Sequence, residues 1–137
     1  MDHDQSLLGG LDGVERLEAF QRAYRVSLEI HKATLSFPRI EQHALADQLR
    51  RATKAIPANL AEGHGRASSS AAVWRNHIAI AIASADEARV WLRYALDLGY
   101  IDEPHWRVWS EAYREIARML QSLRKRSAER GRPGSGN

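Results

Sequence analysis

The stretch QLRRATKAIPANLAEGHGR, residues 48–66, decides the fold class. Apolar side chains recur in it at spacings of three and four residues, which places them on one face of an α-helix. With the residues just before it, the stretch predicts a helix from about residue 41 to residue 62. The predicted apolar seam consists of Leu45, Leu49, Ala52, Ile56 and Leu60.

Two residues mark the course and the end of this helix. Pro57 lies inside it, and we expect it to remove one backbone hydrogen bond and to bend the helix axis. Gly63 follows the helix and is predicted to be its C′ residue, because the left-handed conformation of a helix cap costs glycine nothing.

The polar residues around this turn have a structural and a functional interpretation. In the structural one, which we favour, Asn59 and Glu62 hydrogen-bond backbone groups around the bend. Arg66 then pairs with Glu62 or Glu87, and a buried Glu87 would act as a specificity element within the fold. In the functional interpretation, a site at this turn is formed by Asn59, Glu62, Gly63 and Arg66.

Three further segments show helical periodicity, and none alternates with the period of two that is typical of a strand. They span about residues 14–35, 70–98 and 102–127. Ser68, Ser69 and Ser70 offer N-caps for the second of these segments, and Asp102 is a suitable N-cap for the third. Their predicted core seams are Leu17, Phe20, Tyr24, Leu28, His31 and Leu35 in the first, Trp74, Ile78, Ala81, Ala85, Ala88 and Leu92 in the second, and Trp109, Tyr113, Ile116, Leu120 and Leu123 in the third.

Four helices joined by short loops predict an all-α fold, an antiparallel up-down-up-down four-helix bundle over residues 13–127. The flanking segments are expected to be a flexible lead-in at residues 1–12 and a disordered basic tail at residues 128–137.

The composition argues against several classes of function. There is no cysteine for a disulfide or a thiolate, and no signal peptide or stretch of about 20 apolar residues is recognisable. The six histidines do not form the i, i+4 pair of a helical zinc site, and no acid–base–nucleophile constellation can be assembled. We therefore expect a cytoplasmic protein that is not an enzyme, without a metal or a cofactor.

Extra apolar faces on the predicted helices indicate a homo-oligomer. The segment at residues 70–98 has a second apolar stripe away from its core seam, where a monomer needs polar residues. The segment at residues 14–35 repeats the pattern with Ala19, Ala23, Val26, Ile30 and Ala33. The alternative is that alanine is simply a good helix former on a surface. The predicted interface residues are Ile80, Trp91, Tyr94 and Leu98.

The positive charge gathers on the outward faces of two predicted helices. Such linear arrays suit phosphate binding, because each arginine or lysine can neutralise one phosphate. The alternative is a solvated, salt-bridged surface, since Glu111 and Glu115 lie beside the array on the last helix. The candidate nucleic-acid-binding residues are Arg50, Arg51, Lys54, Arg107, Arg114, Arg118, Arg124 and Lys125.

Residues 48–66 also carry a family resemblance. They resemble the signature of small four-helix bundle proteins encoded in intervening sequences of bacterial 23S rRNA genes: Gln-Leu-Arg-Arg-Ala, then Ile-Pro-x-Asn-Ile-Ala-Glu-Gly, then Gly-Arg. Residues 83–88 stand where the family has Gly-Ser-x-x-Glu-Leu, with Ala83 in place of the glycine, and Leu60 replaces the commoner isoleucine. The resemblance spans about residues 14–125.

The resemblance implies more than the residues show. The family looks related to the accessory proteins of diversity-generating retroelements, which are basic, pentameric barrels of four-helix bundles that bind a reverse transcriptase and nucleic acid. It therefore implies a ring-like homopentamer and a reverse-transcriptase partner. Our leading hypothesis is a non-catalytic oligomer that binds RNA or DNA backbones without sequence preference. The competing hypothesis is a protein-interaction scaffold that binds an acidic or polymerase partner and does not touch nucleic acid.

Overall fold

The computed structural model contains four long helices, as the apolar periodicity predicts. It describes residues 13–130, with side chains as far as Ala128. The described residues contain no strand, so the prediction of an all-α fold is confirmed. The elements are η1 (Gly13–Arg16), α2 (Glu18–Thr34), η2 (Arg39–Glu41), α3 (Leu45–His64), α4 (Ala71–Asp97) and α5 (Glu103–Arg130).

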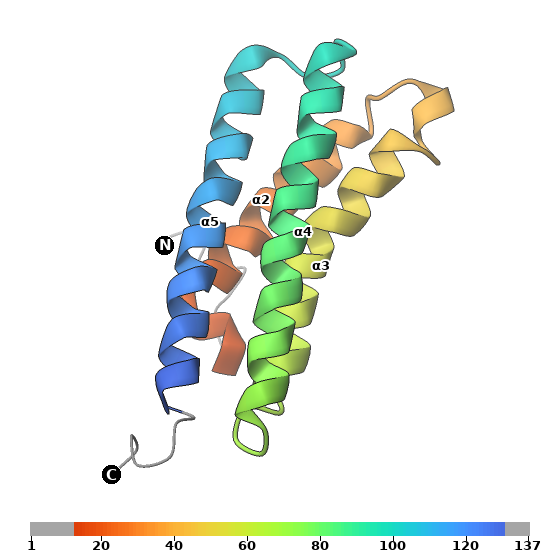
Figure 1. Ribbon diagram of the computed structural model, residues 1–137. Coiled ribbons are helices and arrows are strands. Elements are labelled where there is room, and N and C mark those ends of the chain that lie inside the picture. Colours follow the sequence, from red (N-terminus) through yellow and green to blue (C-terminus); the bar gives the residue numbers. More distant parts are fainter. Residues whose placement is uncertain (1–12, 131–137) are drawn as a thin grey trace, which may run out of the picture.

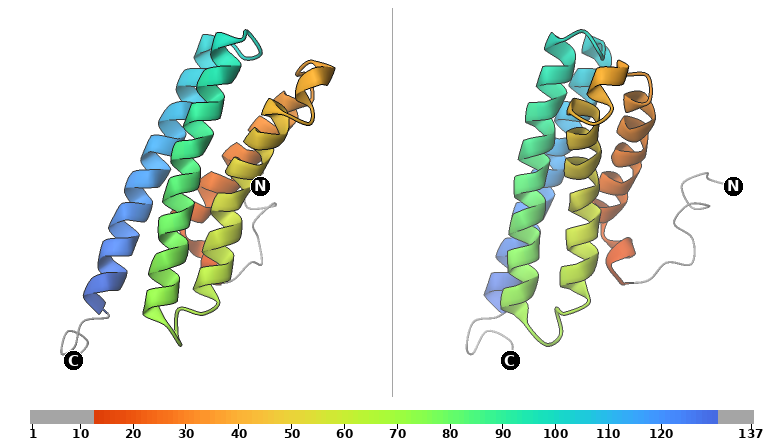
Figure 2. Two further views of the ribbon diagram at one scale, coloured as in Figure 1. Left: turned by 45° about the vertical axis from the view of Figure 1, so that its right-hand side comes forward. Right: turned by 90° about the vertical axis from the view of Figure 1, so that its right-hand side faces the viewer.

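The four helices form an antiparallel up-down-up-down bundle, as predicted (Figure 1). Helix α3 packs on α2 and α4, and α5 packs on α4 and α2, so α3 and α5 occupy opposite corners. The interface between α2 and α5 is the smallest of the four. Figure 2 shows the pair α2–α3 leaning away from the pair α4–α5 towards the end that carries the α4–α5 turn.

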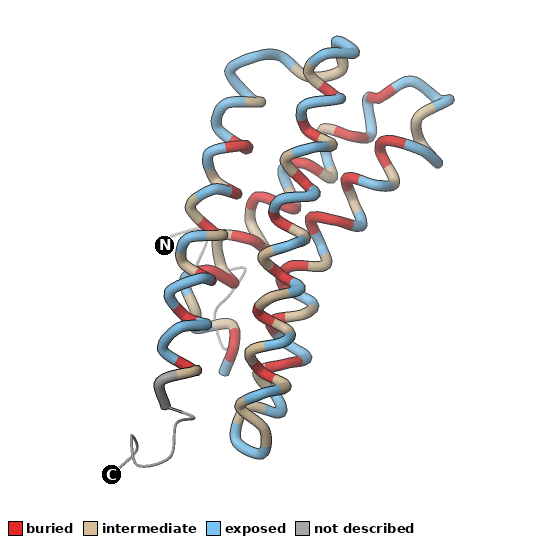
Figure 3. The backbone as a smooth tube through the Cα atoms, viewed as in Figure 1, coloured by how far each residue is buried: buried red, intermediate tan, exposed pale blue. Residues whose placement is uncertain are grey.

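Buried residues follow the inward sides of all four helices (Figure 3). The predicted seams of α3, α4 and α5 are buried at every position, so these three predictions are confirmed. The core face of α4 carries many small side chains. Because these side chains are alanines, the neighbouring helices can approach α4 closely. The alanines in question are Ala81, Ala85, Ala88 and Ala95, all with 0% exposure.

The prediction for the core face of α2 was wrong at most positions, although Phe20 is buried as predicted. The face that we took for an interface, with Ala23 and Ile30, is buried in the bundle, whereas Leu35 is 63% exposed. The true face also contains Ser27 and Thr34, whose hydroxyls donate to the carbonyls of Tyr24 and His31 in the same helix at 2.7 and 2.6 Å. Because these hydroxyls are satisfied locally, two polar residues can enter the core. The apolar face of α2 therefore gives no support to an oligomer.

The helix ends agree with the sequence in part. Ser70 Oγ accepts from the backbone N–H of Val73 at 3.2 Å, and Asp102 Oδ1 accepts from the N–H of His105 at 2.9 Å, so both predicted N-caps are confirmed. Helix α3 begins at Leu45 because the chain before it forms the separate turn η2. Helix α5 continues past the predicted boundary at residue 127. The lead-in at residues 1–12 and the tail from residue 131 lie outside the described residues.

Gly63 is not the C′ residue that the sequence suggested. Helix α3 continues through it to His64, and it is buried against α4. A Cβ atom at this position would lie 2.5 Å from the Cβ of His77 and 3.0 Å from Cε3 of Trp74. A side chain at residue 63 therefore has no room, because the side chains of His77 and Trp74 on α4 already occupy the space.

We expect Gly63→Ala to lower the free energy of unfolding by about 1–3 kcal/mol, because the new methyl group must push α4 away. Gly65→Ala is the matched control. Its Cβ would meet only backbone oxygens at 3.7 Å, and its φ of −61° suits alanine. We expect the control to be neutral or stabilising by about 0.4–1 kcal/mol. Urea unfolding followed by circular dichroism measures both, and equal effects of the two changes would contradict this account of Gly63.

Candidate nucleic-acid interface

The predicted cations of α3 and α5 do not form one surface. The two helices lie at opposite corners of the bundle, so their outward faces point in different directions. The cations of α3 and the cations of α5 must therefore be considered as separate groups.

Arg50 on α3 serves the fold. Its guanidinium donates to Thr34 Oγ1 at 3.0 Å, to Gln42 Oε1 at 3.2 Å and to the Gln42 carbonyl at 2.7 Å. Gln42 in turn donates to the carbonyls of Thr34 and Phe37. These bonds fasten the α2–α3 connection to α3, and they leave the half-buried Arg50 poorly placed to receive a phosphate.

The other two predicted cations of α3, Arg51 and Lys54, are exposed, and each contacts a neighbouring side chain. Arg51 pairs with Asp47 at 2.9 Å, one helical turn away. The ammonium of Lys54 lies 2.9 Å from Nδ1 of His31, which therefore accepts as a neutral ring. The pKa of His31 is lowered, first by partial burial and then by the positive charges of Lys54 and Arg50. This side of the bundle thus has a few separated cations and no continuous array.

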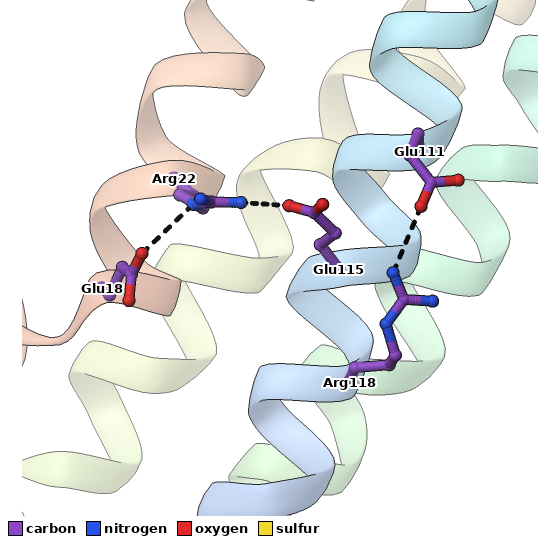
Figure 4. A network of polar contacts seen from close by, with 5 residues as sticks. All are labelled: Glu18, Arg22, Glu111, Glu115 and Arg118. Atoms are coloured by element: carbon purple, nitrogen blue, oxygen red, sulfur yellow. Dashed lines mark hydrogen bonds and ion pairs between the residues drawn. The ribbon is translucent and has the colours of Figure 1, made fainter.

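The cations of α5 form a stripe whose charge changes along the helix. Arg107 pairs with Glu103, so the first turns of the helix are close to neutral. Glu111 accepts from Arg118 at 3.2 Å (Figure 4). It also lies 3.8 Å from Arg114. One carboxylate therefore faces two guanidinium groups.

The last turns of α5 are strongly positive. Arg124 and Lys125 are exposed, and neither makes an ion pair with a described residue. The sequence placed Glu115 beside the stripe, but Figure 4 shows this carboxylate turned towards α2, where it pairs with Arg22. Arg22 also lies 3.5 Å from Glu18, so one guanidinium faces two carboxylates between α2 and α5. Because Glu115 points towards α2, it does not pair with the cations of the stripe.

Helix α4 adds arginines that the sequence prediction missed. Arg75, Arg89 and Arg93 are spaced by fourteen and four residues, which places them on one side of α4. Arg93 lies 5.3 Å above the ring of Trp106 on α5, so this side borders α5. The spacing was visible in the sequence, but the neighbouring helix was not. We define the α4–α5 basic face by Arg75, Arg89, Arg93, Arg107, Arg114, Arg118, Arg124 and Lys125.

The motif residues of α3 make structural contacts. Pro57 is buried inside α3, and Asn59, two residues later, donates to the carbonyl of Ala55 at 2.8 Å and contacts Nδ1 of His77 at 3.1 Å. The predicted hydrogen bond of Asn59 to a backbone group is present. Whether Pro57 bends the axis stays a prediction.

The two glutamates of the motif lie at the surface. Glu62 is 4.0 Å from Arg66, with both side chains more than half exposed, so this pair adds little stability. Glu87 is also exposed and accepts from Nε1 of Trp91 at 3.0 Å. The expectation of a buried Glu87 beside an arginine was wrong, because its position on α4 faces outward.

The predicted interface residues of α4 stay largely uncovered. Ile80, Tyr94 and Leu98 are 41%, 54% and 53% exposed. Trp91 is half-buried, and its ring lies 5.8 Å from that of Tyr94. A stripe of large apolar side chains therefore remains on the outward side of α4.

A cavity of about 430 Å³ lies between α2 and the α4–α5 turn. Several of its polar groups are paired: Trp109 Nε1 donates to Glu29, and Asp102 lies 2.6 Å from Nδ1 of His105. The backbone N–H and the ring of His105 lower the pKa of Asp102. Among the described residues no group of three potential metal ligands occurs. None of the described helices is both long enough and apolar enough to cross a membrane.

Residues 15–122 match the family model described as 23S rRNA-intervening sequence protein. The chain belongs to this family. The match includes the whole of residues 48–66, so the family resemblance seen in the sequence is confirmed. The relation of the 23S rRNA-intervening sequence proteins to retroelement accessory proteins stays a prediction.

A solved structure supports the fold of this 23S rRNA-intervening sequence protein. It is a crystal structure of a protein of unknown function from the S23 ribosomal protein family of Bacteroides thetaiotaomicron. The TM-score is 0.69 at 22% identity, over 78% of this chain and 98% of the other. At this identity the likeness concerns the fold alone. No curated protein matches the chain.

We expect Arg50→Gln to lower the free energy of unfolding by about 1–3 kcal/mol, because its three hydrogen bonds are charge-assisted and partly buried. Arg51→Gln removes the same charge from the next residue, which is exposed, and should change stability by less than about 0.5 kcal/mol. Chemical denaturation of the two variants measures the difference. If Arg51→Gln proved the more harmful change, the structural role of Arg50 would be wrong.

Proposed function

We propose that the protein is a non-catalytic, sequence-tolerant nucleic-acid-binding protein that contacts RNA or DNA backbones through the α4–α5 basic face. One observation carries the proposal. The arginines of α4 lie beside the cationic stripe of α5, as the contact between Arg93 and Trp106 shows, so two helices contribute charge to one surface.

The distribution of carboxylates supports this choice of surface. Glu115 pairs with Arg22 across the α2–α5 interface, and Glu111 is shared between Arg114 and Arg118. The last turns of α5 add Arg124 and Lys125 without a described counter-ion. Phosphates can replace absent or shared counter-ions, and the release of condensed cations from the nucleic acid then favours binding.

The proposal includes a homo-oligomer held together through the exposed apolar stripe of α4. An uncovered tyrosine, leucine and isoleucine on one helix favour a protein interface over solvent. The stripe lies beside α3, away from the α4–α5 basic face, because His77 and Arg93 mark the two sides of α4 that border α3 and α5. Copies joined in this way, five of them if the family resemblance holds, would leave every basic face accessible.

The competing function is a scaffold for an acidic protein or for a polymerase such as a reverse transcriptase. The same apolar stripe favours it, since a partner chain could cover the stripe in place of a second copy. A pull-down that survives nuclease treatment and recovers one stoichiometric protein would support the scaffold.

We expect the combined change of Arg114, Arg118, Arg124 and Lys125 to glutamine to weaken binding to structured RNA and duplex DNA by roughly tenfold or more at low salt. The slope of log affinity against log salt should fall by about 0.9 for each duplex phosphate that the variant no longer neutralises. Fluorescence anisotropy over a salt series gives both quantities.

The matched control removes four charges from exposed residues of the opposite side, by changing Lys32, Arg39, Arg51 and Lys54 to glutamine. We expect this control to retain most of the affinity and most of the salt slope. Equal losses in the two variants would show that only net charge matters. Absence of binding by the unaltered protein at low salt would refute the proposed function and favour the scaffold.

We expect Tyr94→Glu to dissociate the oligomer, because a carboxylate would be buried without a partner at the interface. Light scattering coupled to size exclusion should then give the mass of the 15.5 kDa chain. Leu35→Glu is the control, since it places the same charge at an exposed apolar residue of α2. If Leu35→Glu dissociates the protein and Tyr94→Glu does not, the interface lies on α2.

A further inference from the structure

Two buried N–H donors beside the α4–α5 seam have no acceptor among the described residues. They are Nε1 of Trp106 and Nε of Arg89. A buried donor without an acceptor costs about 1–3 kcal/mol, so proteins rarely keep one unless a water or a ligand completes it. The third such group, the hydroxyl of Tyr113, is sealed in the core and has no access to a ligand.

Trp106 differs from Tyr113 because it lines a notch in the protein surface. The notch has a volume of about 250 Å³. A water molecule takes about 30 Å³ in the liquid, so the notch has room for a tetrahedral anion and several waters. The other lining residues are Arg107, Ser110, Glu111 and Arg114.

The chemistry of the notch favours an anion with several oxygens. Arg114 is 3.8 Å from Glu111, which is too long for a hydrogen bond, so its N–H groups remain able to donate. Glu111, the carboxylate in the notch, already accepts from Arg118 at 3.2 Å. The indole N–H of Trp106 and the hydroxyl of Ser110 add uncharged donors beside these arginines.

The tryptophan ring is held in place while Arg107 and Arg114 can move. The ring of Trp106 packs against the hydrophobic core, and the guanidinium of Arg93 lies over it at 5.3 Å. The side chains of Arg107 and Arg114 are 69% and 52% exposed, so a change of rotamer costs them little. Because the indole N–H is itself buried, an anion in the notch has to displace a lining side chain to reach it, and the exposed Arg107 and Arg114 are side chains that can move.

We propose that this notch is a phosphate-binding site in which Trp106 Nε1 and the guanidinium of Arg114 donate to phosphate oxygens. The inference rests on the proposed function, in which the phosphate is a backbone phosphodiester of bound nucleic acid. Neighbouring phosphates of the same strand would then continue along α5 to Arg118, Arg124 and Lys125. The notch would fix the register of the strand on an otherwise diffuse basic face.

The test is an NMR titration of the full-length ¹⁵N-labelled protein with inorganic phosphate, at ionic strength held constant with chloride. The indole resonance of Trp106 is assigned by its disappearance in Trp106→Phe. We expect it to shift downfield and to saturate, because its N–H gains an acceptor. The indole N–H groups of Trp91 and Trp109, which already donate to Glu87 and Glu29, should stay still. An unmoved Trp106, or equal shifts of all three, would overturn the site.

Substitutions separate the site from general electrostatics. Arg114→Gln should weaken phosphate binding at Trp106 by about tenfold, whereas Arg51→Gln, which removes the same charge from α3, should leave it unchanged. Trp106→Phe retains the ring and lacks the N–H, and it should weaken binding of an oligonucleotide without lowering the salt slope. Trp106→Tyr is a second variant without the indole N–H, in case Trp106→Phe fails to fold. If the affinity for the oligonucleotide is unchanged in both folded variants, Trp106 does not contact the nucleic acid.

The titrations also separate this inference from the proposed function. If phosphate shifts the indole resonance of Trp106 to saturation but the protein binds neither RNA nor DNA, the phosphate site is supported and nucleic-acid binding is refuted. Binding of RNA with Trp106 unaffected by phosphate would refute the site alone. A shift produced by a polyglutamate peptide and not by phosphate would overturn the phosphate assignment and identify the notch as a carboxylate site for an acidic protein.

Discussion

The bundle depends on how closely α3 approaches α4 at Gly63. The absence of a side chain there allows the Cβ of His77 and the ring of Trp74 to rest against the backbone of α3. One turn earlier, Asn59 joins α3 to His77 by a hydrogen bond. Further along α4, alanines with no exposed surface face the core, so the close spacing continues over the length of the helix. The position of α4 then fixes which of its sides borders α5, and therefore where its arginines lie.

The net charge of each surface depends on which cations its carboxylates pair with. Glu115 would neutralise the cationic stripe of α5 if it pointed outward, yet Arg22 draws it towards α2. Arg50 would extend a basic surface on α3, yet the α2–α3 connection uses its donors. On the α4–α5 basic face Glu111 is shared by Arg114 and Arg118, whereas Asp86, Asp97 and Glu103 each pair with one arginine. The eight cations of this face therefore outnumber the carboxylates that pair with them.

The sequence sufficed for three of the four core seams and for the order of the helices. On α3 and α5 one face is clearly more apolar than the other, and on α4, which has two apolar stripes, the one that we took for the core is the buried one. On α2 both faces are apolar, and periodicity cannot choose between them. The choice depends on Ser27 and Thr34, whose hydroxyls bond their own helix and so tolerate burial. Gly63 was misread for a related reason, since a glycine near a helix end looks the same whether it serves a cap or a close approach.

The candidate site could be predicted only in part, because spacing along one helix says nothing about its neighbour. The stripe from Arg107 to Lys125 followed from helical geometry, but the separation of the α3 cations needed the bundle topology. Arg93 became relevant only through its position over Trp106. The buried indole N–H of Trp106 has no signature in the sequence at all, since it depends on what surrounds the ring.

The small interface between α2 and α5 has a consequence for the order in which the chain folds. Nearly all other packing joins helices that follow one another in the sequence, so hairpins α2–α3, α3–α4 and α4–α5 can form with short loop closures. The contacts between α2 and α5 join residues as far apart as Arg22 and Glu115. We therefore expect the chain to fold quickly, to close its first and last helices at a late step, and to open first along the same seam.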